Sequence, residues 1–160
     1  MSEAATFSAD TTSRDSLADE VRLILRVPSG RSVRRSAGLW DHQPLIRRGL
    51  PVRSLDAVAE RLGVGMGELA AVLRTTTRSI DRWRAREARL SETISDRLYR
   101  VAYVIALAET VFADREKARQ WMSRPNRALR HATPFDSLDN EVGARHVEEV
   151  LVRLRHGVFG

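Results

Sequence analysis

Hydrophobic residues recur at intervals of three and four along most of this 160-residue chain, which is the spacing of one face of an α-helix. The first such segment lies around residues 15–26, where Leu17, Val21 and Leu25 share a face. From Pro44 onward the same spacing continues almost to the C-terminus. No segment alternates β-branched or aromatic residues with polar ones in the manner of a β-strand. The pattern therefore predicts an all-α fold.

Breaks in this pattern divide the chain into four predicted regions. Residues 1–14 are rich in Ser, Thr and Ala, and we expect them to form a disordered tail. Residues 15–44 hold the first helix and an irregular linker over 27–44, where Pro, Gly and a basic stretch interrupt the spacing. Residues 45–90 and 91–160 are expected to form two helical modules.

The 45–90 region has the layout of a helix-turn-helix. After a short turn at Leu45–Gly49, a helix is predicted over Ser54–Arg61, with a tight connection at Gly63–Gly67. A short helix over Glu68–Leu73 follows, and a three-residue turn leads into a polar helix near Thr77–Arg86. This order of elements is typical of DNA-binding domains that place the last of these helices in the major groove.

The 91–160 region is also helical. Its predicted helices run from Ser91 or Ser95 to about Phe112, from the cap Asp114 to about Met122, and from about Asn140 to Arg155. Pro125 and Pro134 interrupt the chain before the last helix, and Gly157 is placed to end it. The residues alone show no chemistry here, and a helical module of this kind usually binds protein or oligomerises.

The net charge of +6 lies almost entirely in the middle of the chain. Residues 45–90 carry 10 basic and 5 acidic residues, whereas residues 1–44 carry 6 of each and residues 91–160 carry 11 and 10. A local excess of positive charge favours a polyanionic partner such as nucleic acid, although a solvated basic surface without a partner has the same composition.

The polar helix near Thr77–Arg86 carries the candidate DNA contacts. Arg74, Arg78, Arg82 and Arg86 recur every four residues, which predicts that they stack along one helical face. Arginine suits this role because its planar guanidinium binds guanine edges or phosphates through two hydrogen bonds. The hydroxyls of Thr76, Thr77 and Ser79, near the helix N-terminus, are expected to bind phosphate, and Ile80 and Trp83 are expected to face the core.

The chain shows no signature of an enzyme or of a bound cofactor. Gly63, Gly65 and Gly67 neither follow a strand nor precede a Gly-Lys-Ser sequence, so we interpret them as turn glycines rather than a phosphate loop. His146 and Glu149 have a spacing that metal ligands use, but no third ligand is in view. We therefore expect a non-enzymatic protein with no catalytic residue, no cofactor and no metal.

The cellular setting is expected to be the cytoplasm. The chain has no cysteine, which excludes disulfides and is typical of a reducing compartment. No apolar run approaches the roughly 20 residues that a transmembrane helix needs. The N-terminus is polar, unlike a signal peptide.

A series of short motifs resembles one known family. The C-terminal motifs are Ser95–Arg100, Ala118–Trp121, Arg124–Leu129, Thr133–Leu138, Gly143 and Leu154–Gly157. The upstream motifs are Gly49–Pro51 and Arg78–Trp83. In this order they resemble the Xre/ParS/MbcA antitoxins of type II toxin–antitoxin systems over roughly residues 45–158. The chain departs from that pattern at Arg130 and His131, where the family usually has small residues, and at Trp83, where a second arginine is expected.

The resemblance implies a protein partner for the 91–160 region. Antitoxins of this family neutralise a RES-domain toxin that degrades NAD or transfers its ADP-ribose, and they cover the toxin's active site. An arginine-bearing last helix suits a pocket built to hold a pyrophosphate, and we expect residues 150–160 to insert at or near it. The expected toxin-binding residues are Arg124, Asn126, Arg145, Arg153, Arg155, His156, Gly157, Val158 and Phe159.

The resemblance also implies a use for the helix-turn-helix. Family members often bind operator DNA and repress their own operon, so we expect a homodimer and a toxin–antitoxin hetero-oligomer. Two alternatives remain open from the residues. One is a stand-alone helix-turn-helix regulator whose C-terminal module only dimerises, and the other is a helical enzyme or RNA-binding adaptor.

Overall fold

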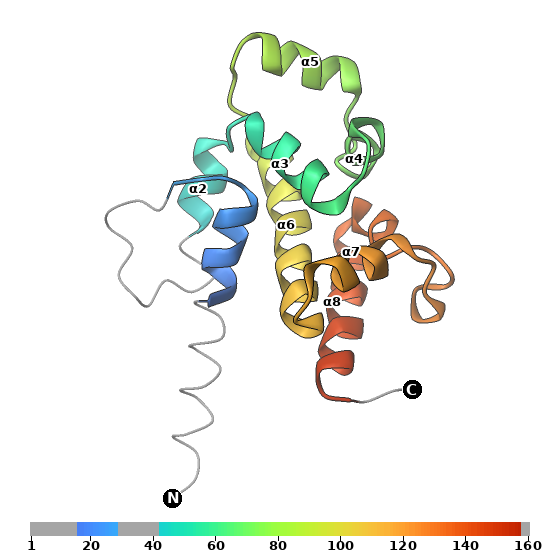
Figure 1. The fold of residues 1–160 in the computed structure, drawn as a ribbon. Helices are drawn as coiled ribbons and strands as arrows, with labels where there is room; N and C mark the ends of the chain where they lie inside the picture. Colours follow the sequence, from blue (N-terminus) through green and yellow to red (C-terminus); the bar gives the residue numbers. More distant parts are fainter. Residues whose placement is uncertain (1–15, 29–41, 158–160) are drawn as a thin grey trace, which may run out of the picture.

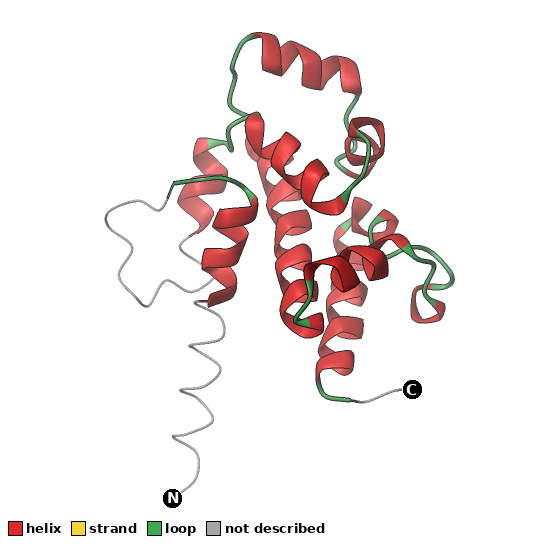
Figure 2. Ribbon diagram, viewed as in Figure 1, coloured by secondary structure: helices red, strands yellow, loops and turns green. Residues whose placement is uncertain are grey.

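A computed structural model describes residues 16–28 and 42–157, and these residues form helices joined by short loops (Figure 2). The first helix spans residues 16–24. The others are α2 (Gln43–Arg48), α3 (Arg53–Leu62), α4 (Met66–Val72), α5 (Thr77–Ala85), α6 (Glu92–Phe112), α7 (Arg115–Ser123), the 3₁₀ turns η2 (Arg127–Leu129) and η3 (Asp136–Asp139), and α8 (Glu141–Arg155). No strand occurs in the described ranges, apart from one isolated bridge between Pro51 and Arg89. The all-α prediction is confirmed.

Helix α6 is the axis on which α2, α3, α7 and α8 pack (Figure 1). Eleven of its residues are buried, and over residues 101–108 every residue except the partly buried Tyr103 is buried, so this central part is covered on nearly all sides. Helices α2, α3, α7 and α8 all contact α6, and small residues such as Ala102, Ala106 and Ala108 allow them to approach closely. One continuous apolar core therefore extends from the first helix to α8.

Two buried serines fix the N-terminal segments on this core. The Ser95 hydroxyl of α6 accepts a hydrogen bond from the Leu50 N–H at 2.9 Å, and the Ser54 hydroxyl donates to the Leu25 carbonyl at 2.7 Å. Both side chains are fully buried, where an unpaired backbone group would be costly. Ser91, rather than Ser95, is the N-cap of α6, because its hydroxyl accepts from the Ile94 N–H.

An ion-pair cluster joins the first helix, α3 and α6. Arg61 donates two hydrogen bonds to Glu109, at 2.7 and 2.6 Å, and a third to Glu20 at 2.7 Å. The side chains of Arg61 and Glu109 are only 13% and 12% exposed, so this pair is screened far less than a surface pair. Its hydrogen bonds with Glu109 raise the pKa of Arg61.

Most helix predictions are confirmed, with one element missed and some ends displaced. The short turn predicted at Leu45–Gly49 is wrong, because residues 43–48 form helix α2. Pro44 lies in its first turn, where a missing N–H costs nothing, and Gly49 ends it with φ +83°. Gly67, predicted to be a turn glycine, lies inside α4, and only Gly63 and Gly65 form the connection before it.

Gly143 of α8 lies against the backbone of η3, so it offers a sharp test of packing. A Cβ at this position would lie 2.0 Å from the Ser137 carbonyl oxygen. Gly143→Ala is expected to lower the free energy of unfolding by about 1–3 kcal/mol, measured by urea denaturation, because the backbone must shift. The control is Gly67→Ala, whose Cβ meets nothing within 4 Å and which should stabilise the protein by about 0.5–1 kcal/mol. Equal effects of the two changes would contradict this packing.

Candidate functional site

Helices α4 and α5 form a helix-turn-helix held on the core by a few buried side chains. Leu69 and Leu73 at one end of the motif and Ile80 in α5 are fully buried. The turn begins at Arg74, which follows the C-cap of α4 and lies in the left-handed region with φ +53°. Arg97 of α6 donates a hydrogen bond to the Leu73 carbonyl at 2.9 Å, so the buried axis also fixes the end of α4.

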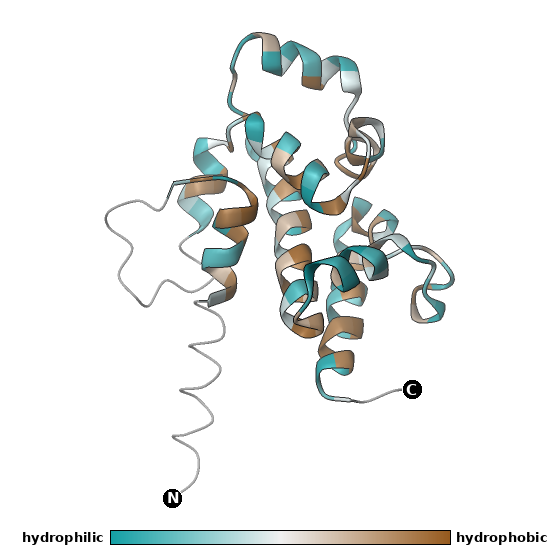
Figure 3. Ribbon diagram, in the orientation of Figure 1, coloured by the Kyte–Doolittle hydropathy of each residue, from teal (hydrophilic) through white to brown (hydrophobic). Residues whose placement is uncertain are grey.

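Helix α5 is the most exposed long element of the motif. Ile80 is its one buried residue and Trp83 is half-buried, so both face the core as expected. Arg78 and Arg82 are exposed, and neither forms an ion pair with any residue that the structure describes. Hydropathy colouring shows a largely hydrophilic α5 at the edge of the molecule (Figure 3). This helix therefore presents free positive charge to solvent.

The arginine series does not continue as one helical face. Helix α5 spans Thr77–Ala85, so Arg74 precedes it in the turn and Arg86 is its C-cap. Only Arg78 and Arg82 occupy successive helical turns. The prediction of four arginines stacked on one helix is wrong for Arg74, because the cap at Thr76 starts the helix after it, and Arg86 lies at the C-cap where the helix ends. Contact of any of them with DNA stays a prediction.

The hydroxyls near the start of α5 have a structural role. The Thr76 hydroxyl oxygen accepts from the Ser79 N–H at 3.1 Å and caps the helix, and the same hydroxyl donates to the Ser79 hydroxyl at 3.1 Å. Thr77 is exposed and is the first residue of the helix. Phosphate binding by these three residues stays a prediction, and Thr76 has cap formation as its first role.

A second surface comprises the loop between α7 and η3. The Asn126 side chain accepts from the Ala128 N–H at 2.9 Å, and the Asn126 backbone bonds to Ala132 and His131. This network closes the loop and leaves Arg124, a predicted site residue, exposed. Two further arginines, Arg127 and Arg130, are exposed on the same loop and were missed by sequence reasoning. The basic residues on both sides of Pro125-Asn126 are the sequence feature that could have indicated this surface.

The same loop contains two residues in the left-handed region. Arg130 has φ +55° and His131 has φ +66°, which favour glycine. The family that the chain resembles usually has small residues at these two positions. The structure gives the physical reason, since a residue without a Cβ adopts this conformation without strain.

Helix α8 brings most of the remaining predicted residues to one end of the molecule. Val147, Val150 and Leu151 pack on α6, and Asn140 caps the helix by accepting from the Gly143 N–H. The polar side chains behave differently along the helix and beyond. Arg145 pairs with Glu141, whereas Arg153, Arg155 and His156 are exposed. Gly157 follows the helix with φ +68°. Val158 and Phe159 lie outside the described residues.

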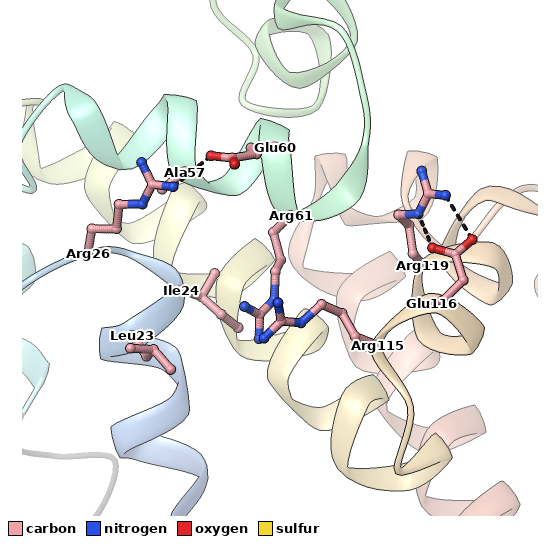
Figure 4. Close-up of a pocket in the computed structure, with 9 residues that line it drawn as sticks. All are labelled: Leu23, Ile24, Arg26, Ala57, Glu60, Arg61, Arg115, Glu116 and Arg119. Carbon is pink, nitrogen blue, oxygen red and sulfur yellow. Dashed lines mark hydrogen bonds and ion pairs between the residues drawn. The ribbon is translucent and has the colours of Figure 1, made fainter.

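A hollow of about 410 Å³ lies between the first helix, α3 and α7 (Figure 4). Its arginines are paired: Arg26 with Glu60, Arg61 with Glu109, Arg115 with Glu109 and Arg119 with Glu116. Hydrogen bonds from Arg119 and then Gln120 lower the pKa of Glu116 to about 2. Because carboxylates neutralise its arginines, this hollow does not favour the binding of an anion.

Two further surveys of the described residues add no site. Within these residues, no group of three His, Asp or Glu side chains is placed to hold a metal ion. The helices among them are too short or too polar to cross a bilayer.

Comparison with family models divides the chain into two matched parts. Residues 41–103 match the antitoxin Xre-like helix-turn-helix domain, and residues 107–157 match the C-terminal toxin-binding domain of the antitoxins Xre, MbcA and ParS. Helix α6 spans the junction between these two matches.

Known proteins agree with these models. The chain is 32% identical to antitoxin Xre of Photorhabdus laumondii over 115 residues, which are 71% of this chain and 78% of that protein. It is 33% identical to the mycobacterial cidal antitoxin MbcA of Mycobacterium tuberculosis over 108 residues, 66% of this chain and 92% of that one. The crystal structure of the M. tuberculosis MbcT–MbcA toxin–antitoxin complex contains a chain with TM-score 0.52 and 29% identity, covering 68% of this chain and 96% of that chain. The family resemblance is confirmed.

The cap that Thr76 forms at the start of α5 leads to a test by substitution. Thr76→Ala removes the cap of α5 and is expected to cost about 1 kcal/mol of stability, measured by thermal or urea unfolding. Thr76→Ser keeps the capping oxygen and should retain stability close to that of the parent. If Thr76→Ala and Thr76→Ser unfold alike, the cap contributes nothing to the fold.

Proposed function

The chain belongs to the Xre/MbcA/ParS antitoxin family, and we propose that it neutralises a cognate toxin by covering the toxin's active site. The toxin is a RES-domain enzyme that consumes NAD, by degrading it or by transferring ADP-ribose. The antitoxin itself acts by binding, without catalysis or a cofactor, and it works in the cytoplasm where NAD and operator DNA are both present.

The observation that carries this proposal is the toxin-binding family match over residues 107–157, which includes an exposed basic end of α8. Arg153, Arg155 and His156 are clustered there, and neither arginine pairs with a carboxylate in the described part of the chain. Cations at a helix C-terminus are favoured by the helix dipole. Guanidinium groups are also suited to a pocket that binds a pyrophosphate and holds an acidic catalytic residue.

The basic loop between α7 and η3 supplies a second contact region. Its turn η2 packs against α8, so Arg124 and Arg127 belong to the same rigid unit as the end of that helix. Such a unit needs little ordering on binding, which favours affinity. Arg124, Asn126 and Arg145 are accordingly proposed to contact the toxin around its pocket.

Helix α5 supports a second binding activity, which is autorepression of the operon. Its free arginines and its position at the edge of the molecule suit insertion into a major groove (Figure 1). A homodimer would place two such helices on half-sites separated by about one helical turn of DNA, or a multiple of it. We propose that the same dimer takes part in the toxin–antitoxin hetero-oligomer.

Removing the end of α8 should weaken neutralisation. A chain that ends at Val152 is expected to inhibit the toxin at least tenfold less well, measured as NAD consumption by the co-expressed toxin, because charged contacts in a buried interface are worth about 2 kcal/mol or more. The double change Arg153→Ala/Arg155→Ala should show the same direction without removing backbone. Full inhibition by the shortened chain would refute active-site coverage by this end. Purification of the native protein without any bound NAD-consuming enzyme would favour a stand-alone regulator instead.

Changing the exposed arginines of α5 should affect only DNA binding. Arg78→Ala/Arg82→Ala is expected to weaken binding to the DNA upstream of the gene by roughly 30-fold or more, since each of the two contacts is worth about 1–3 kcal/mol. The measurement is fluorescence anisotropy at moderate salt, with toxin inhibition assayed in parallel and expected to be unchanged. Arg26→Ala/Arg119→Ala removes the same charge from ion-paired sites and is the control. Unchanged affinity in the α5 variant would count against this helix as the DNA-reading element.

A further inference from the structure

We infer that a hollow beside the C-terminal end of α5 binds the phosphate backbone of duplex DNA next to the major-groove contact. The hollow has a volume of about 540 Å³ and lies between the end of the first helix, α2, the start of α3 and the linker from α5 to α6. This inference rests on the proposed DNA binding by α5 and adds a second, sequence-independent contact to it.

The charges that line this hollow are unbalanced. Arg22, Arg48, Arg53 and Arg89 line it, and Glu87 is the one acidic residue among its lining residues in the described ranges. None of these four arginines forms an ion pair with any residue that the structure describes. Four guanidinium groups around one hollow repel each other, and an anion placed between them removes that repulsion.

The hollow in Figure 4 is a useful comparison, because its arginines are neutralised by carboxylates of the same chain. It also carries four arginines, but every one is paired with a glutamate. Both hollows are built from the same kinds of helix surface in the same chain. The two hollows therefore differ in the pairing of their arginines, and the lack of carboxylate partners around Arg48 and Arg53 among the described residues favours a partner that supplies the negative charge.

The position of the hollow favours DNA over other polyanions. Arg89 follows the C-cap of α5, Arg86, by three residues, a length of chain that spans at most roughly 11 Å. The linker is fixed, because the Leu90 N–H donates to the Leu50 carbonyl at 2.9 Å and Arg89 donates to the Gly49 carbonyl at 2.7 Å. A helix lying in the major groove has sugar-phosphate backbone alongside it, so a rigid basic hollow at its end meets phosphates rather than base edges.

The rest of the lining agrees with recognition of the backbone. Pro28, Pro44 and Pro51 contribute no N–H donors, and Val27 and Leu45 are apolar. Donors to an anion in this hollow thus come mainly from guanidinium groups, which bind phosphate oxygens in pairs. Such contacts position the protein without reading sequence.

The test is the salt dependence of DNA binding by the full-length chain carrying Arg48→Gln/Arg53→Gln. Both side chains are exposed, so the substitutions spare the core. Affinity is measured for the duplex upstream of the gene and for an unrelated duplex of equal length. Loss of two phosphate contacts should make the slope of log K against log salt shallower by about two. It should also weaken binding to both duplexes by the same factor, roughly tenfold or more. The matched control, Arg26→Gln/Arg119→Gln, removes two paired arginines of the other hollow and should change neither quantity.

Each other outcome overturns the inference. If Arg48→Gln/Arg53→Gln behaves as the control does while the α5 variant loses affinity, the hollow takes no DNA phosphate and the proposed function stands. If toxin affinity falls instead, the hollow binds an acidic surface of the toxin. If the parent chain binds neither duplex, the DNA-binding part of the proposed function fails, and this inference fails with it.

Discussion

Burial of the central part of helix α6, residues 101–108, on nearly all sides is the constraint on which the rest of the structure depends. A helix with apolar residues around its whole circumference is stable in water only when other helices surround it. Helices α2, α3, α7 and α8 supply that cover, so the N-terminal and C-terminal family matches share one core. The two family-matched regions are thereby held in a fixed relation by a single hydrophobic core.

The same arrangement determines which surfaces are left for partners. Once four helices have placed their apolar faces on α6, their polar faces and the less buried α5 point to solvent. Helix α5 contributes a single fully buried side chain, Ile80, and depends on the Thr76 cap and on the fixed end of α4 for its position. Helix α5 is therefore held by Ile80 and by contacts at its N-terminal end, while most of its surface remains exposed.

Ion pairing then decides which of the many arginines are available. Arg61, Arg84 and Arg119 have carboxylate partners, whereas Arg48 and Arg53 have none among the described residues. Net charge along the chain points to the 45–90 region as basic, but it does not separate neutralised from free guanidinium groups. A partner's phosphates or carboxylates are attracted mainly to the unpaired guanidinium groups, because paired charges produce little electric field at a distance.

The sequence by itself determined the helical class, the order of the helices, the helix-turn-helix and the family, because spacing and end caps such as Asp114 and Asn140 are local properties. Tertiary structure decided what depends on contacts between distant segments. Helix α2 exists because its apolar side chains reach the core. Ser95 is a buried hydrogen-bond partner of Leu50. Position 143 requires glycine because the backbone of Ser137 lies too close for a Cβ. Tertiary structure also decides the pairing of some arginines, because the carboxylate that neutralises Arg61 is Glu109 on another helix, 48 residues away. Other pairs, such as Arg119 with Glu116, are local to one helix.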